Sequence, residues 1–159
     1  CKIYIEDFYR TLTSFDFLPP GEGSSYEAVF EYLLPYSDNT RFDCIMGWDI
    51  FNYLERQELR YLIFHLARFC HPGTLLFALV STQRRIPDKP STYKILDQNR
   101  LLYEMNSSIF RSCPRYGYSD LKRLLPGFRI SNSLILRNGF KEYAFVYDGA
   151  VSNGSRTVA

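Results

Sequence analysis

The sequence lacks most of the short motifs that carry familiar chemistry. It has no G-x-S-x-G, no P-loop and no C-x-x-C pair, and two histidines, His65 and His71, are too few for a histidine-rich metal site. Its four cysteines lie far apart, at Cys1, Cys44, Cys70 and Cys113. That spacing favours reduced thiols in the cytoplasm over a disulfide framework or a zinc site. Hydrolytic catalysis and metal chemistry are therefore not expected.

Charge and hydropathy give no indication of two further classes of protein. The chain carries 19 Lys and Arg against 17 Asp and Glu, and its net charge of +2 is too small to indicate a nucleic-acid partner. No apolar run approaches the roughly 18–20 residues of a membrane span. With 159 residues, 46% of them hydrophobic and 23% charged, the composition is that of one globular domain, unusually rich in Phe and Tyr.

Residues 42–81 carry the clearest pattern, that of a strand, a helix and a second strand. The apolar run between Asp43 and Asp49 does not alternate, as expected of a strand that is covered on both faces. A second apolar run, from Thr74 to Ser81, follows the helix breaker His71-Pro72-Gly73. A helix between these runs would connect two parallel strands of one α/β sheet.

That connecting helix is predicted from about Glu55 to Cys70. Asn52 is a candidate N-cap, with Glu55 three residues further on as in a capping box. Apolar residues recur at spacings of three and four, which makes one buried stripe. The stripe consists of Leu59, Leu62, Ile63, Leu66 and Cys70.

Before this unit, the sequence predicts a short strand and a helix. Lys2–Ile5 alternates like a strand and runs into the acids Glu6 and Asp7, and Tyr26–Leu34 has a helical period. An acid at the end of a strand can accept hydrogen bonds from ribose hydroxyls. The plainer interpretation is that these acids form a solvated strand end or cap a short helix that begins at Phe8.

After this unit, loops precede a helix and a hairpin. Ser81–Ser91 and Cys113–Tyr118 are loops that either cover a substrate as a lid or lie in solvent. Ser119 is the expected N-cap of a short helix, Asp120–Leu125. Two strands over residues 128–147 flank Asn-Gly, a strong hairpin turn.

Polar side chains gather where the first strand of the central unit ends. Ligands of open α/β sheets bind at the carboxyl ends of strands, and Trp48, Asp49 and Asn52 stand there in the sequence. Asp49 can accept hydrogen bonds from a ligand, and the Trp48 indole can stack on a base. The alternative is that Asp49 or Asn52 only caps the helix while Trp48 fills the core.

The order of these elements resembles the second half or more of a class I S-adenosylmethionine-dependent methyltransferase. The local matches are Phe42-Asp43 opening a strand that Asp49 closes, His71-Pro72-Gly73 before Leu75-Leu76-Phe77, and Leu125-Pro126-Gly127-Phe128 before a closing hairpin. The resemblance covers roughly Ile3 to Asp148. It implies a Rossmann-like α/β sheet, mostly parallel with a C-terminal antiparallel hairpin, in a domain of residues 1–148 followed by a flexible tail, 149–159.

The resemblance also implies a cofactor site. Glu6 or Asp7 would bind the ribose of S-adenosylmethionine, Asp16 the adenine amine, and Trp48 and Asp49 would face cofactor and substrate. The methyl acceptor is not identified by the sequence. The family's first strand and its glycine-rich turn are missing, so the fold is expected to be incomplete at its N-terminus. The chain is then either a piece of a longer enzyme or a relative that no longer binds the cofactor.

Two alternatives from other classes remain. The first is a non-catalytic methyltransferase-like module that binds a protein partner at the open edge of its sheet. The second is a receiver-like phosphoacceptor domain, for which Glu6-Asp7, Asp49, Thr82 and Lys89 form a suggestive series. The spacing opposes this second alternative, because seven residues between Thr82 and Lys89 leave no room for the helix and strand expected there.

Overall fold

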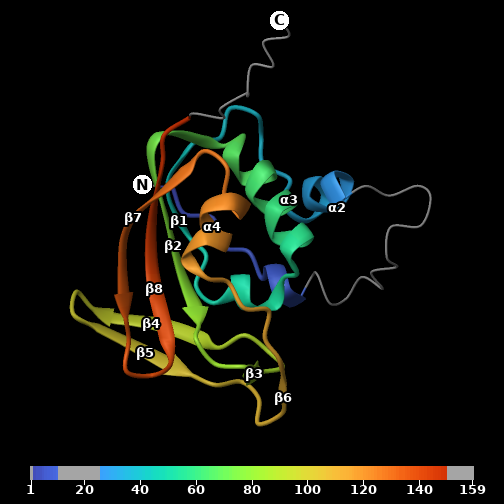
Figure 1. Ribbon diagram of the computed structural model, residues 1–159. Coiled ribbons are helices and arrows are strands. Elements are labelled where there is room, and N and C mark those ends of the chain that lie inside the picture. Colours follow the sequence, from blue (N-terminus) through green and yellow to red (C-terminus); the bar gives the residue numbers. More distant parts are fainter. Residues whose placement is uncertain (1, 11–25, 150–159) are drawn as a thin grey trace, which may run out of the picture.

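The computed structural model describes residues 2–10 and 26–149. Figure 1 shows a twisted sheet with helices packed against it and a long β-hairpin that projects from its lower end. In chain order the elements are α2 (Tyr26–Leu33), β1 (Phe42–Met46), the 3₁₀ helix η1 (Ile50–Tyr53), α3 (Arg56–Ala67), β2 (Cys70–Ser81), β3 (Arg85–Pro87), β4 (Thr92–Asp97), β5 (Arg100–Glu104), β6 (Phe110–Ser112), α4 (Tyr118–Leu124), β7 (Phe128–Ile135) and β8 (Phe140–Tyr147).

The central sheet has the strand order β1-β2-β8-β7 and is mixed. β1 and β2 are parallel, whereas β8 pairs antiparallel with both β2 and β7. The fold class is therefore α/β as predicted, but the expectation of a mostly parallel sheet is wrong for the described residues. The antiparallel β8 next to β2 also opposes the receiver-like alternative, which requires an all-parallel sheet.

The predicted strand–helix–strand unit is confirmed as β1, α3 and β2. The α3 residues Leu59, Leu62, Ile63 and Leu66 are buried, so the stripe read from the sequence is the packed face. The predicted cap is wrong, because the Glu55 backbone N–H donates to Glu58 Oε2 at 2.7 Å and Asn52 lies one element earlier, in η1. The predicted helix breaker His71-Pro72-Gly73 lies inside β2, in a bulge near the start of the strand where Gly73 has φ +96°.

The C-terminal helix and hairpin are confirmed as α4, β7 and β8. Gly139 lies at φ +85° in the turn, a conformation that glycine adopts without a steric penalty. The N-cap of α4 differs from the prediction. Asp120 Oδ2 accepts the Gly117 N–H at 3.0 Å, so the helix begins one residue before Ser119.

The N-terminal segment departs from the predicted strand. Residues 2–7 form no strand, and the Tyr4 ring packs edge-on against Tyr36 and Phe42 near the start of β1. The predicted flexible tail lies outside the described residues from position 150 onward.

Among the described residues, helices cover one face of the sheet, so the expectation that β1 is covered on both faces is wrong. Figure 1 shows α2, α3 and α4 on the same side. The main core lies between them and the sheet, and its fully buried members include Phe30, Leu59, Ile63, Leu121 and Phe145. On the other face Met46 and Leu75 remain 43% and 48% exposed. No helix of the described part is long and apolar enough to cross a membrane.

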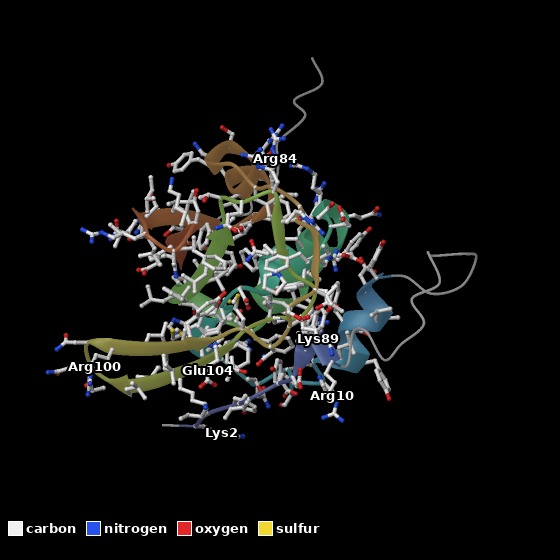
Figure 2. The ribbon with its side chains drawn as sticks, turned by 90° about the horizontal axis from the view of Figure 1, so that it is seen from below. Lys2, Arg10, Arg84, Lys89, Arg100 and Glu104 are labelled. Atoms are coloured by element: carbon white, nitrogen blue, oxygen red, sulfur yellow. The ribbon has the colours of Figure 1, made fainter. Side chains whose placement is uncertain are left out.

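Two small ribbons lie between β2 and α4, and the first of them includes part of the expected loop Ser81–Ser91. β3 pairs with β6, and β4 pairs with β5 in a hairpin that we call the arm (residues 91–104). Neither ribbon extends the central sheet. We call the central sheet and its helices the body. In Figure 2 the arm reaches away from the body, with Arg100 at its free end and Lys89 near its root.

Candidate functional site

The site begins with a strained residue at the carboxyl end of β1. Trp48 has φ +45°, the left-handed region that bulky side chains rarely adopt. Backbone hydrogen bonds hold this turn against β2, from Gly47 N–H to Phe77 O at 2.8 Å and from Leu79 N–H to Trp48 O at 2.6 Å. A Cβ on Gly47 would lie 3.1 Å from Phe77 O, so glycine permits the close approach. The direction of the Trp48 ring is therefore set by the body of the protein.

The Trp48 ring carries an aromatic partner from the arm. Tyr93 of β4 stacks on it with ring centroids 4.9 Å apart and planes only 5° from parallel. Phe77 of β2 contacts it edge-on at 5.7 Å. A second pair, Tyr103 on Phe140 at 6.1 Å, also attaches the arm to the body. Such pairs contribute about 0.5–1.5 kcal/mol each beyond their buried area, so the arm is held closed by a modest free energy.

Asp49 lies beneath this stack and is almost completely buried. Its side chain is 3% exposed, it does not cap η1, and its Oδ2 accepts the backbone N–H of Ser91 at 3.1 Å. Burial raises the pKa of the Asp49 carboxyl, and the Ser91 N–H acts in the opposite direction. A buried acid with a raised pKa at the end of a parallel strand is typical of a functional site.

The Tyr93 hydroxyl is the unusual group of the site. Its oxygen is buried and has no hydrogen-bond partner among the described residues. Burial, and next the negative charge of Asp49, raise the pKa of this hydroxyl. Tyr93 therefore gains a ring stack at Trp48 while its polar end is left unsatisfied.

Asn52 positions the site rather than capping a helix. It is 1% exposed, its Nδ2 donates to Asp49 O and to Leu79 O at 2.9 Å each, and its Oδ1 accepts the Ser81 N–H at 2.7 Å. One side chain thus joins η1 to the last residues of β2. The sequence offered no signal for this role, because the partners are backbone groups 27 and 29 residues away.

Two tyrosines that sequence reasoning missed fix the root of the arm. Tyr53 Oη donates to Lys89 O at 2.9 Å and Tyr9 Oη to Asp88 O at 2.6 Å, and the two rings meet edge-on at 5.1 Å. Most of the predicted lid, Ser81–Ser91, is therefore held against the body. The part that can act as a lid is the arm, which begins at Ser91. The high tyrosine content was the only hint in the sequence.

The second predicted lid segment belongs to the interior. Cys113 and Tyr116 are buried, and Tyr116 Oη donates to the Leu54 carbonyl. The prediction that Cys113–Tyr118 covers a substrate is wrong, because Tyr116 packs into the core and Tyr118 is the first residue of α4.

The remaining predicted site residues lie elsewhere or outside the described residues. Glu6 and Asp7 are exposed on the N-terminal segment, and Asp7 Oδ1 accepts the Arg10 N–H at 3.1 Å, as a helix cap does. Asp16 falls outside the described residues. The structure therefore brings together Trp48 and Asp49, while Glu6 and Asp7 lie on a separate, solvated segment.

With the arm closed, these residues do not fit an adenosyl cofactor. Tyr93 occupies the face of Trp48, and Ser91 and Tyr93 cover Asp49. Any ligand at this end of the sheet requires the arm to move. Within residues 2–10 and 26–149, no three His, Cys, Asp or Glu side chains come together as metal ligands.

Replacing Asp49 by asparagine should stabilise the protein. Because burial raises the Asp49 pKa above its ordinary 3.8, the folded state binds more protons than the unfolded state just above that pH, and stability falls as pH rises through the folded pKa. Asparagine removes this loss, accepts the Ser91 N–H and can donate to Tyr93 Oη. We expect a gain of roughly 0.5–2 kcal/mol in the free energy of unfolding at pH 7. Urea unfolding of the wild type and of Asp49→Asn from pH 4 to pH 7 measures this gain. If the free energy of unfolding depended on pH in the same way in both proteins, the prediction would be contradicted.

Comparisons with known proteins give distant structural likenesses. No family model and no curated protein matches the chain. The crystal structure of the glycopeptide N-methyltransferase MtfA with S-adenosyl-L-homocysteine is similar, with a TM-score of 0.46 and 11% identity over 78% of this chain and 59% of that one. An S-adenosylmethionine-dependent methyltransferase from Clostridium acetobutylicum ATCC 824 gives 0.47 and 9% over 89% and 70%.

A third likeness is to the PH0226 protein of Pyrococcus horikoshii OT3, with a TM-score of 0.46 and 13% identity over 70% of this chain and 54% of that one. The chain thus spans a little over half the length of the Pyrococcus and MtfA structures. At these identities no residue role transfers from one protein to the other.

Proposed function

We propose that this chain is a methyltransferase-like domain whose ligand site is the carboxyl end of β1 and β2. The observation that carries the proposal is the buried Asp49 next to the left-handed Trp48, directly after a parallel strand. Ligands of open α/β sheets bind at this position, and strained backbone and buried acids cluster at functional sites. The antiparallel hairpin that follows α4 agrees with the resemblance stated from the sequence.

The residues have distinct roles in this proposal. Trp48 and Asp49 shape the side of the site that meets the methyl acceptor, with Asn52 holding them against β2. Glu6 or Asp7 binds the ribose of S-adenosylmethionine and Asp16 its adenine, as the resemblance implies. The contribution of this chain is to orient the acceptor, which enters once the arm has moved off Trp48.

Titration calorimetry with S-adenosylhomocysteine tests the proposal. The sequence has no glycine-rich turn, so the first question is whether the chain binds this ligand at all, and its affinity answers that question. We expect saturable one-to-one binding, weakened by about 1–3 kcal/mol in either Glu6→Ala or Asp7→Ala, whichever acid holds the hydroxyl pair. The control is Asp43→Ala, since the Asp43 side chain is 98% exposed near the start of β1.

Two outcomes would contradict the proposal at different levels. Unchanged affinity in both acid variants would remove Glu6 and Asp7 from the site. Absence of binding by a chain that unfolds cooperatively would reject the cofactor.

The second candidate function is a non-catalytic module that binds a protein. The uncovered face of the sheet favours it, because Met46, Leu75 and the thiol-bearing Cys44 are exposed beside the free edge at β1. Exposed apolar surface next to an unpaired strand promotes association. Sedimentation of the wild type and of Leu75→Glu over a range of concentrations tests whether this face is an interface.

A further inference from the structure

We infer that Trp48 and Asp49 bind a planar aromatic ring bearing an amino group, and that Tyr93 takes the place of that ring while the arm is closed. The inference rests on the proposed function, since it names the substrate class of the same site. The probe of that class is adenine, a flat ring with one exocyclic amine.

The first support is the geometry of the stack. A separation of 4.9 Å with planes 5° apart is the arrangement that a bound heteroaromatic ring makes with an indole. The Trp48 ring is presented by its own strained backbone and by Phe77, both parts of the body. Its face therefore stays in place whether the arm is open or closed.

The second support is the poor polar match of Tyr93 in this position. Its hydroxyl oxygen is buried close to the Asp49 carboxyl and to Ser91 but makes no well-aligned hydrogen bond with any described residue. An amino group on a ring at the same place would donate to that carboxyl. Asn52 holds the Asp49 carbonyl whether the arm is open or closed, and opening frees Asp49 Oδ2 from the Ser91 N–H to accept that amino group.

The third support is that the arm can leave without breaking the body. β4 and β5 pair with each other and with no other described strand, and a two-stranded hairpin alone has little stability. Tyr53 and Tyr9 hold residues 88 and 89 to the body, so a hinge falls between Lys89 and Ser91. Beyond the stack, Ile95 and Leu101 on the same face as Tyr93 are 69% and 45% exposed. Opening therefore costs the contacts of Tyr93 and Tyr103 and the Ser91 bond.

Trp48 is the single tryptophan of the sequence, so its fluorescence reports on this site directly. The experiment titrates adenine into the wild type, Tyr93→Ala and Tyr93→Phe. Tyr93→Ala uncovers the indole, which should shift emission to longer wavelength and tighten adenine binding roughly tenfold or more, the scale of one base stack. Tyr93→Phe keeps the stack and removes the unsatisfied hydroxyl, so emission should stay unchanged and adenine should bind more weakly than to the wild type.

Purine, which lacks the exocyclic amine, is the matched probe for Asp49. It should bind Tyr93→Ala roughly tenfold more weakly than adenine does, because it has no amine to donate to the buried charge. Equal affinities for the two probes, or no gain in adenine affinity for a cooperatively folded Tyr93→Ala, would overturn the inference.

S-adenosylhomocysteine separates this inference from the proposed function. Adenine binding without S-adenosylhomocysteine binding would leave the ring site standing and reject the cofactor. Binding of S-adenosylhomocysteine without adenine binding would reject the ring site and leave the proposed function standing. If S-adenosylhomocysteine displaces adenine from Trp48, the ring that binds there is the cofactor's own, and the assignment to the acceptor is overturned.

Discussion

Asn52→Ala should lower the free energy of unfolding by about 2–4 kcal/mol. The substitution removes the side-chain partner of Leu79 O and of the Ser81 N–H, whereas Asp49 O keeps the hydrogen bond from the Asn52 backbone N–H. Each unsatisfied group costs roughly 1–3 kcal/mol, and partial relaxation keeps the total below the sum. The loss also frees the turn that holds Trp48, so the stack on Tyr93 should weaken.

Urea unfolding followed by Trp48 fluorescence and by circular dichroism measures both effects of Asn52→Ala. Asn39→Ala is the matched control, since Asn39 is exposed in a loop and its replacement should change stability by less than about 0.5 kcal/mol. A loss below about 1 kcal/mol in Asn52→Ala would mean that water or a shift of η1 satisfies the freed groups. Such a result would reject the role of Asn52 in positioning the site.

Leu59→Ala should cost about 2–5 kcal/mol, the usual range for a buried leucine whose site cannot collapse. Leu59 is completely buried in the stripe of α3 that packs against the sheet. The variant leaves a cavity bounded by regular elements on both sides. Its midpoint in urea should fall without a change in slope, because the surface exposed on unfolding is almost unchanged.

Phe64→Ala on the same helix is the control for Leu59→Ala. Phe64 is 41% exposed and lies beneath the Arg60 guanidinium rather than in the core. Truncating this larger side chain should cost less than truncating Leu59. The reverse order would show that the buried face of α3 had been assigned to the wrong residues.

The central unit and the hairpin could be predicted from sequence because their signals are local. The period of α3 and the turn at Asn138-Gly139 each lie within the element they specify, whereas His71-Pro72-Gly73 lies inside β2, after α3 has ended at Ala67. The mixed order of the sheet could not be predicted in the same way. Pairing of β2 with β8 joins Leu75 to Val146, which lie far apart in the sequence, and no local pattern encodes that choice.

The sequence predicted that Trp48 and Asp49 stand together at the end of a strand, but not which residues surround them. The two residues follow an apolar run, which is a local fact, and topology alone places them at a sheet end. Their partners Tyr93 and Ser91 belong to the arm, which directly follows a charged loop that contains Pro87 and Pro90. The contacts that close the site link residues more than 40 positions apart, so propensity and period carry no information about them.

The position of β8 has a consequence for how the chain acquires its shape during synthesis. This last strand lies inside the sheet, between β2 and β7, rather than at its edge. Until it is made, β2 has an unpaired side and the core residues Tyr143 and Phe145 are missing from beneath the helices. The nascent protein therefore passes through a stage with an exposed apolar strand edge, when chaperone binding and self-association compete with folding.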